Sequence, residues 1–367
     1  PVAGLAPGRA PPPHDVEGGG RFALTRTRLL IALHSASPPW RIPDAAVEAI
    51  RRDFRDVEIM KVESPEDLER KAGEAEILFS WAIGDAAMAR AERLRWLHSP
   101  AAGVGSYLTP SFLARPVPFT NSRGVHAIPI AEHVMGMLTG LARGLREAVV
   151  EQTTTGMRRE SWWDRVPEEL FGKTLGLYGY GAIGREVARR AAAFGMRVVA
   201  LRRRAERPPA WDPELLDAIG LPAEEPRVDA MFGPEDLDRL LAECDVLVVT
   251  AALTKETEGA IDARALGLLK RGAWVVNVAR GRIIRQADLV EALRSGHLGG
   301  AGLDVFESEP LPRESPLTTL DNVLLTPHVS GLSRGFWPRE MRLFRANLAR
   351  FREGRPLLNL VDPSRGY

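Results

Sequence analysis

The sequence predicts an α/β protein made of two doubly wound parallel sheets with a cleft between them. Three observations lead to this fold class: short apolar runs alternate with helical periodicity from Leu29 onward, the alternation occurs as two separate series, and a long periodic segment divides them. Strands that alternate with helices of about ten residues indicate βαβ units and therefore parallel sheets. The length of 367 residues fits two domains of roughly 100–200 residues each.

Residues 1–26 are expected to be a disordered leader. The prolines from Pro7 to Pro13 and the triplet of glycines from Gly18 allow neither a regular helix nor a packed core. A secretory signal would need an apolar stretch of about 7–15 residues, which this segment lacks. An organelle-type presequence stays open, although the proline and glycine clusters argue against an amphipathic helix.

The first series predicts one αβ domain. Its strands are expected to begin near Leu29, Val57, Ile77, Leu94 and Val117, and its helices are expected near residues 43–54, 65–73 and 85–92.

A long helix is expected from Ile128 to about Gln152, between the two series. An amphipathic surface helix needs only one apolar stripe, so a second apolar face favours a homodimer interface, with burial between the domains as the alternative. One stripe consists of Ile130, Val134, Met137 and Leu138, and the further apolar residues are Met135, Leu141 and Val149.

The second series predicts a second αβ domain, followed by a final helix over about 338–352. Because this helix comes after the last strand, we expect it to return to the first domain. The expected division is therefore 27–123 plus 332–367 for one domain and 124–331 for the other. The strands of the second series are expected near 175–178, 197–201, 245–249, 273–278, 302–305 and 322–325.

A glycine-rich turn opens the second series. Strand, turn, helix and strand follow in the order that a dinucleotide-binding Rossmann unit requires, although a plain strand-to-helix turn is the alternative. Glycines permit the tight turn and a close approach to a pyrophosphate, and the helix N-terminus presents free N–H groups to the anion. The residues concerned are Gly179, Gly181, Ala182, Ile183 and Gly184.

Three polar residues follow the ends of later strands. Arg280, Glu309 and His328 each come just after an apolar run. Ligands of an open α/β sheet bind outside the carboxyl ends of its strands, so these side chains can converge on one crevice. Each one alone also has a plain reading, as a solvated arginine, a turn glutamate and a loop histidine.

The runs around these residues resemble the D-isomer-specific 2-hydroxyacid dehydrogenase family. The similarity covers about residues 27–355 and is strongest in the segments 275–282, 302–311 and 322–331. Shorter matches occur at 102–105, 121–124, 131–133 and 172–176.

The resemblance implies a flavodoxin-like substrate domain beside the Rossmann nucleotide domain. It also implies hydride transfer between a nicotinamide cofactor and a small 2-oxo or 2-hydroxy acid of D configuration. Arg280 would bind the substrate carboxylate, His328 would exchange the proton, and Glu309 would hold the imidazole in place.

Further roles follow from the same resemblance. The substrate would meet Gly103, Val104 and Gly105, with Trp81 as pocket wall or as an ordinary core residue. Asp304 would lie near the nicotinamide amide, with a strand-end cap as the alternative. Among the other histidines, His133 is the second candidate for a functional role. The cofactor would also meet Thr250, Val278 and Ala279.

The sequence departs from the family at two places. Thr250-Ala-Ala stands where many members carry His-x-Pro, and the stretch 204–234 is longer than usual, with no chemistry that we can assign to it.

The second strand of the Rossmann unit ends in an arginine tract, Arg202, Arg203 and Arg204, with no acidic residue before Glu206. An acidic residue at this strand end would accept from the ribose of NAD, whereas arginine suits a 2′-phosphate. The sequence therefore predicts NADP as the preferred cofactor, with NAD also usable. The alternative is a solvated loop in an arginine-rich protein.

Composition excludes several other functions. A formal charge of +1 provides no field for nucleic acid, and no apolar run approaches the roughly 20 residues of a membrane span. Cys244 is the single cysteine, which leaves no disulfide and no CxxC-type metal site. We expect this thiol to be inert core, and we expect a cytoplasmic enzyme.

Two other functions compete with the reductase. A nucleotide-sensing scaffold or corepressor-like protein would need none of Arg280, Glu309 and His328. The formate-oxidising branch carries a glutamine where Glu309 stands.

Overall fold

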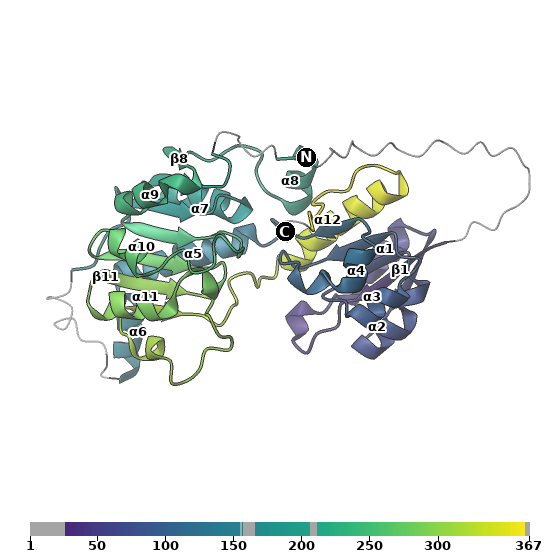
Figure 1. Ribbon diagram of the computed structural model, residues 1–367, viewed down its shortest axis with the longest axis horizontal. Helices are drawn as coiled ribbons and strands as arrows, with labels where there is room; N and C mark the ends of the chain where they lie inside the picture. Colours follow the sequence, from purple (N-terminus) through teal and green to yellow (C-terminus); the bar gives the residue numbers. More distant parts are fainter. Residues whose placement is uncertain (1–25, 155, 157–165, 206–210, 364–367) are drawn as a thin grey trace, which may run out of the picture.

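The computed structural model describes residues 26–154, 156, 166–205 and 211–363. The expected leader therefore lies almost wholly outside the described residues. The described chain forms two lobes side by side, each built on one parallel sheet with helices around it (Figure 1). The predicted fold class is confirmed. In this part of the chain, no helix is both long and apolar enough to cross a membrane.

The first sheet has five parallel strands in the order β2-β1-β3-β4-β5, the flavodoxin-like order. Residues 29–32 of β1 are all buried, as expected for a parallel sheet covered on both faces. Its strands are β1 (Thr27–Ala32), β2 (Val57–Lys61), β3 (Ile77–Ser80), β4 (Trp96–Ser99) and β5 (Phe119–Asn121), and its helices are α1 (Asp44–Asp53), α2 (Pro65–Lys71), α3 (Asp85–Arg90) and α4 (Pro110–Ala114).

The second sheet has seven parallel strands in the order β12-β11-β10-β9-β6-β7-β8. Counted from β6, this is the Rossmann order 3-2-1-4-5-6 with one further strand, and the order reverses between β6 and β9. The strands are β6 (Thr174–Tyr178), β7 (Arg197–Leu201), β8 (Ala230–Phe232), β9 (Val246–Val249), β10 (Ala273–Asn277), β11 (Leu298–Leu303) and β12 (Val323–Leu325). The helices of this part of the chain are α7 (Ala182–Ala193), α8 (Pro213–Ile219), α9 (Leu237–Glu243), α10 (Ala263–Leu268) and α11 (Gln286–Arg294).

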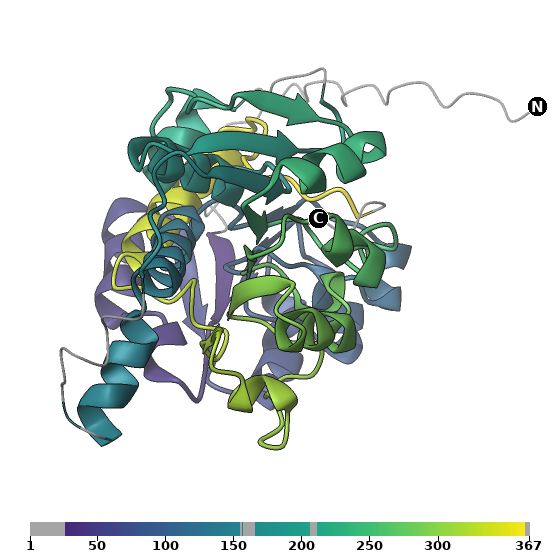
Figure 2. The ribbon, with the colours of Figure 1, turned by 90° about the vertical axis from the view of Figure 1, so that its left-hand side faces the viewer.

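The helix expected over 128–152 is two helices, so that expectation was wrong. Gly144 adopts a left-handed conformation (φ 62°) and ends α5 (Ala127–Arg143), after which α6 (Leu145–Thr154) begins. Glycine tolerates this conformation because it has no Cβ. Figure 2 shows α6 projecting away from the body of the molecule. Met135 and Leu141 pack into the core of their own lobe, so they do not form a second outer face.

The final helix, α12 (Phe336–Arg352), packs against the first sheet. Its residues Met341, Phe344 and Leu348 join the core that contains Leu29 and Phe79. The chain therefore crosses between the lobes twice, near residues 122–127 and 326–335. The exact division into 27–123 plus 332–367 and 124–331 stays a prediction.

Residues 211–234, in the described part of the long stretch 204–234, form a third link between the lobes. Their helix α8 lies against α12 in the space between the lobes (Figure 1). The buried side chain of Arg185 on α7 donates to the carbonyls of Ala223 (3.0 Å) and Glu224 (2.8 Å), which anchors the stretch to its own lobe. At the other end, Arg350 Nε of α12 donates to Glu214 Oε1 at 3.1 Å.

Candidate active site

The glycine-rich turn has the geometry of a dinucleotide loop. Gly179 has φ 110°, and a Cβ there would lie 2.5 Å from the backbone nitrogen of Ala251. A Cβ on Gly184 would lie 2.5 Å from the carbonyl oxygen of Gly179, so the start of α7 packs too closely on the end of β6 for any side chain at position 184. A Cβ on Gly181 would meet nothing within 4 Å. Protein packing therefore explains the outer two glycines, and open space lies beside the middle one.

The start of α7 can receive an anion. Gly181 is its N-cap and supplies no side-chain cap, so the first N–H groups and the positive end of the helix dipole face that space. Thr250, after β9, donates its hydroxyl to the carbonyl of Gly179 at 2.6 Å. It fixes the loop from the neighbouring strand. These residues fit a dinucleotide pyrophosphate.

Glu309 and His328 form a hydrogen-bonded pair. His328 Nδ1 lies 2.7 Å from Glu309 Oε2, and Glu309 Oε1 accepts from the backbone N–H of Phe306 at 3.1 Å. The His328 side chain is 49% exposed. Because Nδ1 is engaged by a carboxylate, it carries a proton, and Nε2 is the nitrogen left to exchange a proton with a ligand.

Arg280 follows β10, which is next to β11 in the sheet. A Cβ on Gly281 would lie 1.8 Å from the carbonyl carbon of Phe306, so the turn after Arg280 touches the segment that leads to Glu309. Across the gap between the lobes, Arg280 Nη2 lies 3.0 Å from the place that a Cβ of Gly103 would occupy. Arg280 thus lies between the segment of the Glu309–His328 pair on one side and the 102–105 loop on the other.

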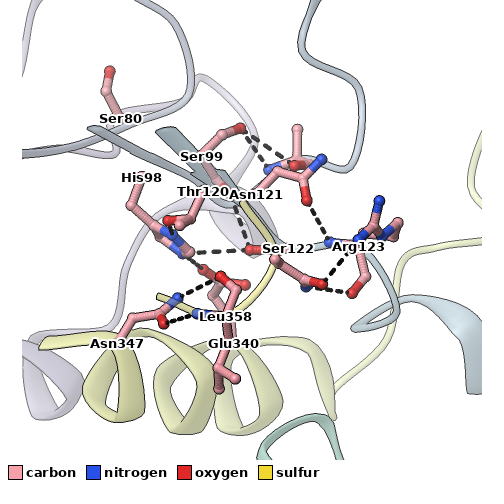
Figure 3. Close-up of polar contacts among 12 residues, drawn as sticks. Ser80, His98, Ser99, Thr120, Asn121, Ser122, Arg123, Glu340, Asn347 and Leu358 are labelled. Atoms are coloured by element: carbon pink, nitrogen blue, oxygen red, sulfur yellow. Dashed lines mark hydrogen bonds and ion pairs between the residues drawn. The ribbon is translucent and has the colours of Figure 1, made fainter. Parts of the chain in front are cut away.

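Polar side chains of β5 and the crossing after it hold the 102–105 loop (Figure 3). Asn121 Nδ2 donates to the carbonyl of Ala102 at 2.8 Å. Ser122 Oγ donates to the carbonyl of Ser99 at 3.0 Å, and the Ser122 N–H donates to Ala101. The loop expected to meet the substrate is therefore tied to the segment that crosses to the other lobe.

A fully buried pair, His98 and Glu340, lies beneath this loop (Figure 3). Thr120 Oγ1 accepts from Trp96 Nε1 at 2.8 Å and lies 2.7 Å from His98 Nδ1. His98 Nε2 lies 3.0 Å from Glu340 Oε1, and because a carboxylate only accepts, Nε2 carries a proton and donates it to Glu340. The pair links β4 to the first turns of α12.

The remaining expected residues lie in three settings. Val278 and Ala279 are buried after β10. Arg202 is half-buried, with Nη2 donating to Ala205 at 3.2 Å, and Arg203 and Arg204 are exposed after β7.

Trp81 is half-buried in an aromatic cluster with Trp40 and Phe336. Its indole nitrogen donates to the carbonyl of Trp40 at 2.9 Å, and its ring stacks on Phe336 with a centroid separation of 6.0 Å. This is the packing of a core tryptophan, and its role as a pocket wall stays a prediction.

Comparison with known proteins decides the family. Residues 135–330 match the family described as D-isomer specific 2-hydroxyacid dehydrogenase, NAD binding domain. The glyoxylate reductase of Thermococcus gammatolerans is 32% identical over 337 residues, which cover 88% of this chain and 93% of that protein. The chain belongs to the D-isomer specific 2-hydroxyacid dehydrogenase family. The predicted family is confirmed.

Other 2-hydroxyacid dehydrogenases are similar at the same level. The D-3-phosphoglycerate dehydrogenase of Methanocaldococcus jannaschii is 32% identical over 76% of this chain, which spans half the length of that relative. A solved D-isomer specific 2-hydroxyacid dehydrogenase from Xanthobacter autotrophicus, in complex with NADPH and MES, has a TM-score of 0.73 and 29% identity over 93% of this chain and all of that chain.

The NADPH-dependent glyoxylate/hydroxypyruvate reductase of Sinorhizobium meliloti, solved with NADP and sulfate, has a TM-score of 0.74 and 27% identity over 93% of this chain and all of that chain. Members of this family are NAD(P)-dependent oxidoreductases, so the predicted enzyme class is confirmed and the scaffold alternative is not favoured.

The sequence placed Asp304 near the nicotinamide amide, with a strand-end cap as the alternative, but did not connect it with Thr326. In this 2-hydroxyacid dehydrogenase the Asp304 carboxylate is fully buried and accepts from the Thr326 hydroxyl at 2.6 Å. Thr326 stands two residues before His328, and that spacing was the available signal.

Proposed function

We propose that this chain reduces a small 2-oxo acid to the D-2-hydroxy acid with NADPH as the preferred cofactor. The observation that carries the proposal is the Glu309–His328 pair, whose half-exposed imidazole lies on the strand-end side of the same sheet as the glycine-rich turn. When bound, the nicotinamide supplies the hydride.

The side chains divide the remaining work. Arg280 is a forked donor that suits a carboxylate, and the loop of Gly103, Val104 and Gly105 faces it from the other lobe. His328 Nε2 gives its proton to the substrate oxygen during reduction and takes it back during oxidation. Glu309 keeps the imidazole oriented, and its negative charge stabilises the charged ring.

A survey of 2-oxo acids tests the reaction. Glyoxylate and hydroxypyruvate, the substrates in the names of similar enzymes, are the first to measure, followed by acids with longer side chains. Turnover with at least one of them is expected. No oxidation of NADPH or NADH with any 2-oxo acid would contradict the proposal.

The preference for NADPH rests on the arginine tract after β7. Hydrogen bonds to charged groups contribute roughly 1.5–3 kcal/mol each, so one good contact to a 2′-phosphate favours NADPH by about tenfold or more. Two similar solved enzymes were crystallised with NADPH or NADP. The test is kcat/KM for both cofactors with one good substrate. Equal values, or a preference for NADH, would refute the preference, whereas a reversal in Arg202→Asp would locate it.

We also propose a homodimer, formed through the nucleotide-binding lobe. The projecting α6 exposes Leu145 (50%), Val149 (59%) and Val150 (45%), and a cavity of about 880 Å³ lies between α6 and the start of β10. Light scattering at micromolar concentration should give twice the monomer mass, and Val149→Asp should lower it. A monomer mass for the unaltered chain would refute the dimer.

The location and partners complete the proposal. One buried cysteine fits a reducing compartment such as the cytoplasm, which cell fractionation tests. The balanced charge favours a small anionic substrate bound locally over a nucleic acid.

A further inference from the structure

Asp304 accepts hydrogen bonds from the backbone of residues 328–330, the segment that carries the His328 side chain. Its carbonyl oxygen accepts from the His328 N–H at 2.8 Å, Oδ1 accepts from the Val329 N–H at 2.9 Å, and Oδ2 accepts from the Ser330 N–H at 2.9 Å. Three successive N–H groups therefore donate to one fully buried residue. The two bonds to the carboxylate, from Val329 and Ser330, are charge-assisted and so are the stronger kind in proteins.

The loop needs this support because His328 has a left-handed backbone, with φ 54°. For a residue with a Cβ this conformation is unfavourable, and it persists only where the surroundings enforce it. The Asp304 carboxylate supplies two of the enforcing contacts. The conformation in turn sets the direction of the imidazole toward Glu309.

The carboxylate is itself held by a two-residue chain. The only proton on Thr326 Oγ1 goes to Asp304 Oδ1 at 2.6 Å, since a carboxylate can only accept. Thr326 Oγ1 therefore accepts from its other neighbour, His133 Nε2, at 2.9 Å. His133 must carry a proton on Nε2, and that nitrogen lies 3.9 Å from Asp304 Oδ1.

His133 is fixed over this carboxylate by close packing of α5 on β11. A Cβ on Gly302 would lie 2.8 Å from the sulfur of Met137, one helical turn after His133. Gly302 is two residues before Asp304 along β11. The glycine thus lets α5 approach closely enough for a side chain at position 133 to reach Thr326.

We propose that His133 is a positioning residue for the reduction, and that through Thr326 and Asp304 it holds the loop that presents His328. The inference rests on the proposed function, in which His328 moves the proton. His133 touches neither member of the Glu309–His328 pair in the described contacts, and it acts by keeping the Thr326 hydroxyl turned to Asp304.

The kinetic test compares paired variants in the full-length enzyme. His133→Ala and Thr326→Val remove the donor and the hydroxyl and should lower kcat roughly 10- to 100-fold, the range expected when a catalytic group is misplaced, with little change in KM for NADPH. His133→Gln and Thr326→Ser keep an N–H donor and a hydroxyl and should recover most of the lost turnover. His297→Ala is the matched control, because it removes a half-buried histidine whose one described bond is to Leu266.

A second readout does not depend on turnover. The proton between His328 Nδ1 and Glu309 should give a downfield NMR signal, identified by its loss in His328→Ala. The signal should vanish or broaden in Thr326→Val and remain in Thr326→Ser. An unchanged kcat in His133→Ala would overturn the inference. An unchanged signal in Thr326→Val would overturn it too, and this second readout needs no 2-oxo acid substrate.

Discussion

The two nitrogens of the His328 imidazole have different surroundings, and this difference determines which of them can act on a substrate. Nδ1 is hydrogen-bonded to Glu309 at 2.7 Å, and the side chain is half exposed. Replacing His328 by alanine should lower kcat by about 10²–10⁴-fold, the usual contribution of a general acid or base. NADPH binding, measured by fluorescence titration, should be retained. A kcat near that of the unaltered enzyme would show that another group supplies the proton.

Arg280 should behave differently from His328. If it binds the carboxylate in both the ground state and the transition state, Arg280→Ala raises KM as well as lowering kcat. Steady-state kinetics over a wide range of substrate concentrations separates the two effects. A fall in kcat with unchanged KM would remove Arg280 from substrate binding.

A substitution of Gly103, in the facing lobe, can displace the side chain of Arg280. A methyl group there would lie 3.0 Å from Arg280 Nη2, and the tip of a flexible side chain can move aside with little effect on folding. Gly103→Ala should therefore lower kcat/KM by roughly tenfold or more while the melting temperature changes little. Gly84→Ala is the matched control, since its Cβ would meet nothing within 4 Å. Unchanged kinetics would show that Arg280 does not work at this distance.

The individual side chains were only partly predictable from the sequence. The convergence of Glu309 and His328 on one crevice was predictable, because strand ends of one parallel sheet share an edge, whereas their pairing was implied by the resemblance to the family. A strand-end cap was one of the two roles expected for Asp304, but its individual bonds depend on how the end of the next strand folds back over β11. The two-residue spacing of Thr326 and His328 was the available sequence signal for that contact, and it does not specify the partners.

Among the elements, the contact between α8 and α12 can be tested directly by a substitution of Arg350. Arg350 is nearly buried and donates to both carboxylate oxygens of Glu214, and its Nη1 donates to Pro356 at 2.6 Å. Arg350→Met should lower the free energy of unfolding by about 1–3 kcal/mol and increase hydrogen exchange in α8.

Arg355→Met is the control for that prediction. Arg355 also lies near Glu214, at 3.6 Å, but its side chain is 45% exposed, and exposed ion pairs contribute little to stability. Equal losses in the two variants would show that α8 is not held by Arg350 in particular.

Elements were predictable where their patterns were long. The two αβ series and the return of a final helix to the first sheet could be read from apolar runs, whereas β8 and α4 could not. β8 has three residues, of which two are only partly buried, and it lies inside the stretch 204–234, so no apolar run marks it. The end of α5 at Gly144 was also missed, because one glycine inside a periodic stretch permits a break without requiring one.

At the scale of the whole molecule, His126 joins the two chain crossings and makes their junction sensitive to pH. Its Nδ1 lies 3.1 Å from the carbonyl oxygen of Gly331, and its ring stacks on Phe336 at 4.9 Å. Burial lowers the pKa of His126 below its ordinary value, despite the opposing effect of the Gly331 carbonyl. The unfolded chain therefore takes up a proton at this residue before the folded chain does.

The free energy of unfolding should consequently fall as the pH drops through about 6.5, the ordinary histidine pKa, and be fully retained above it. Urea unfolding at about pH 7.5 and 5.5 measures the fall. His126→Gln can keep a donor to Gly331 but cannot titrate, so its fall should be smaller. An equal fall in both proteins would exclude His126 as the source.

Two bodies joined by three links on one side can rotate about an axis through that side, but they cannot slide past each other. The two crossings and the α8–α12 contact are such links, because all three meet in one apolar cluster that contains Val125, Leu216 and Phe336. Gly103 and Arg280 should then approach and separate along an arc, always presenting the same faces to each other. A substrate would enter and leave by the side away from the axis, so a change in the packing around Leu216 should alter the width of that entrance.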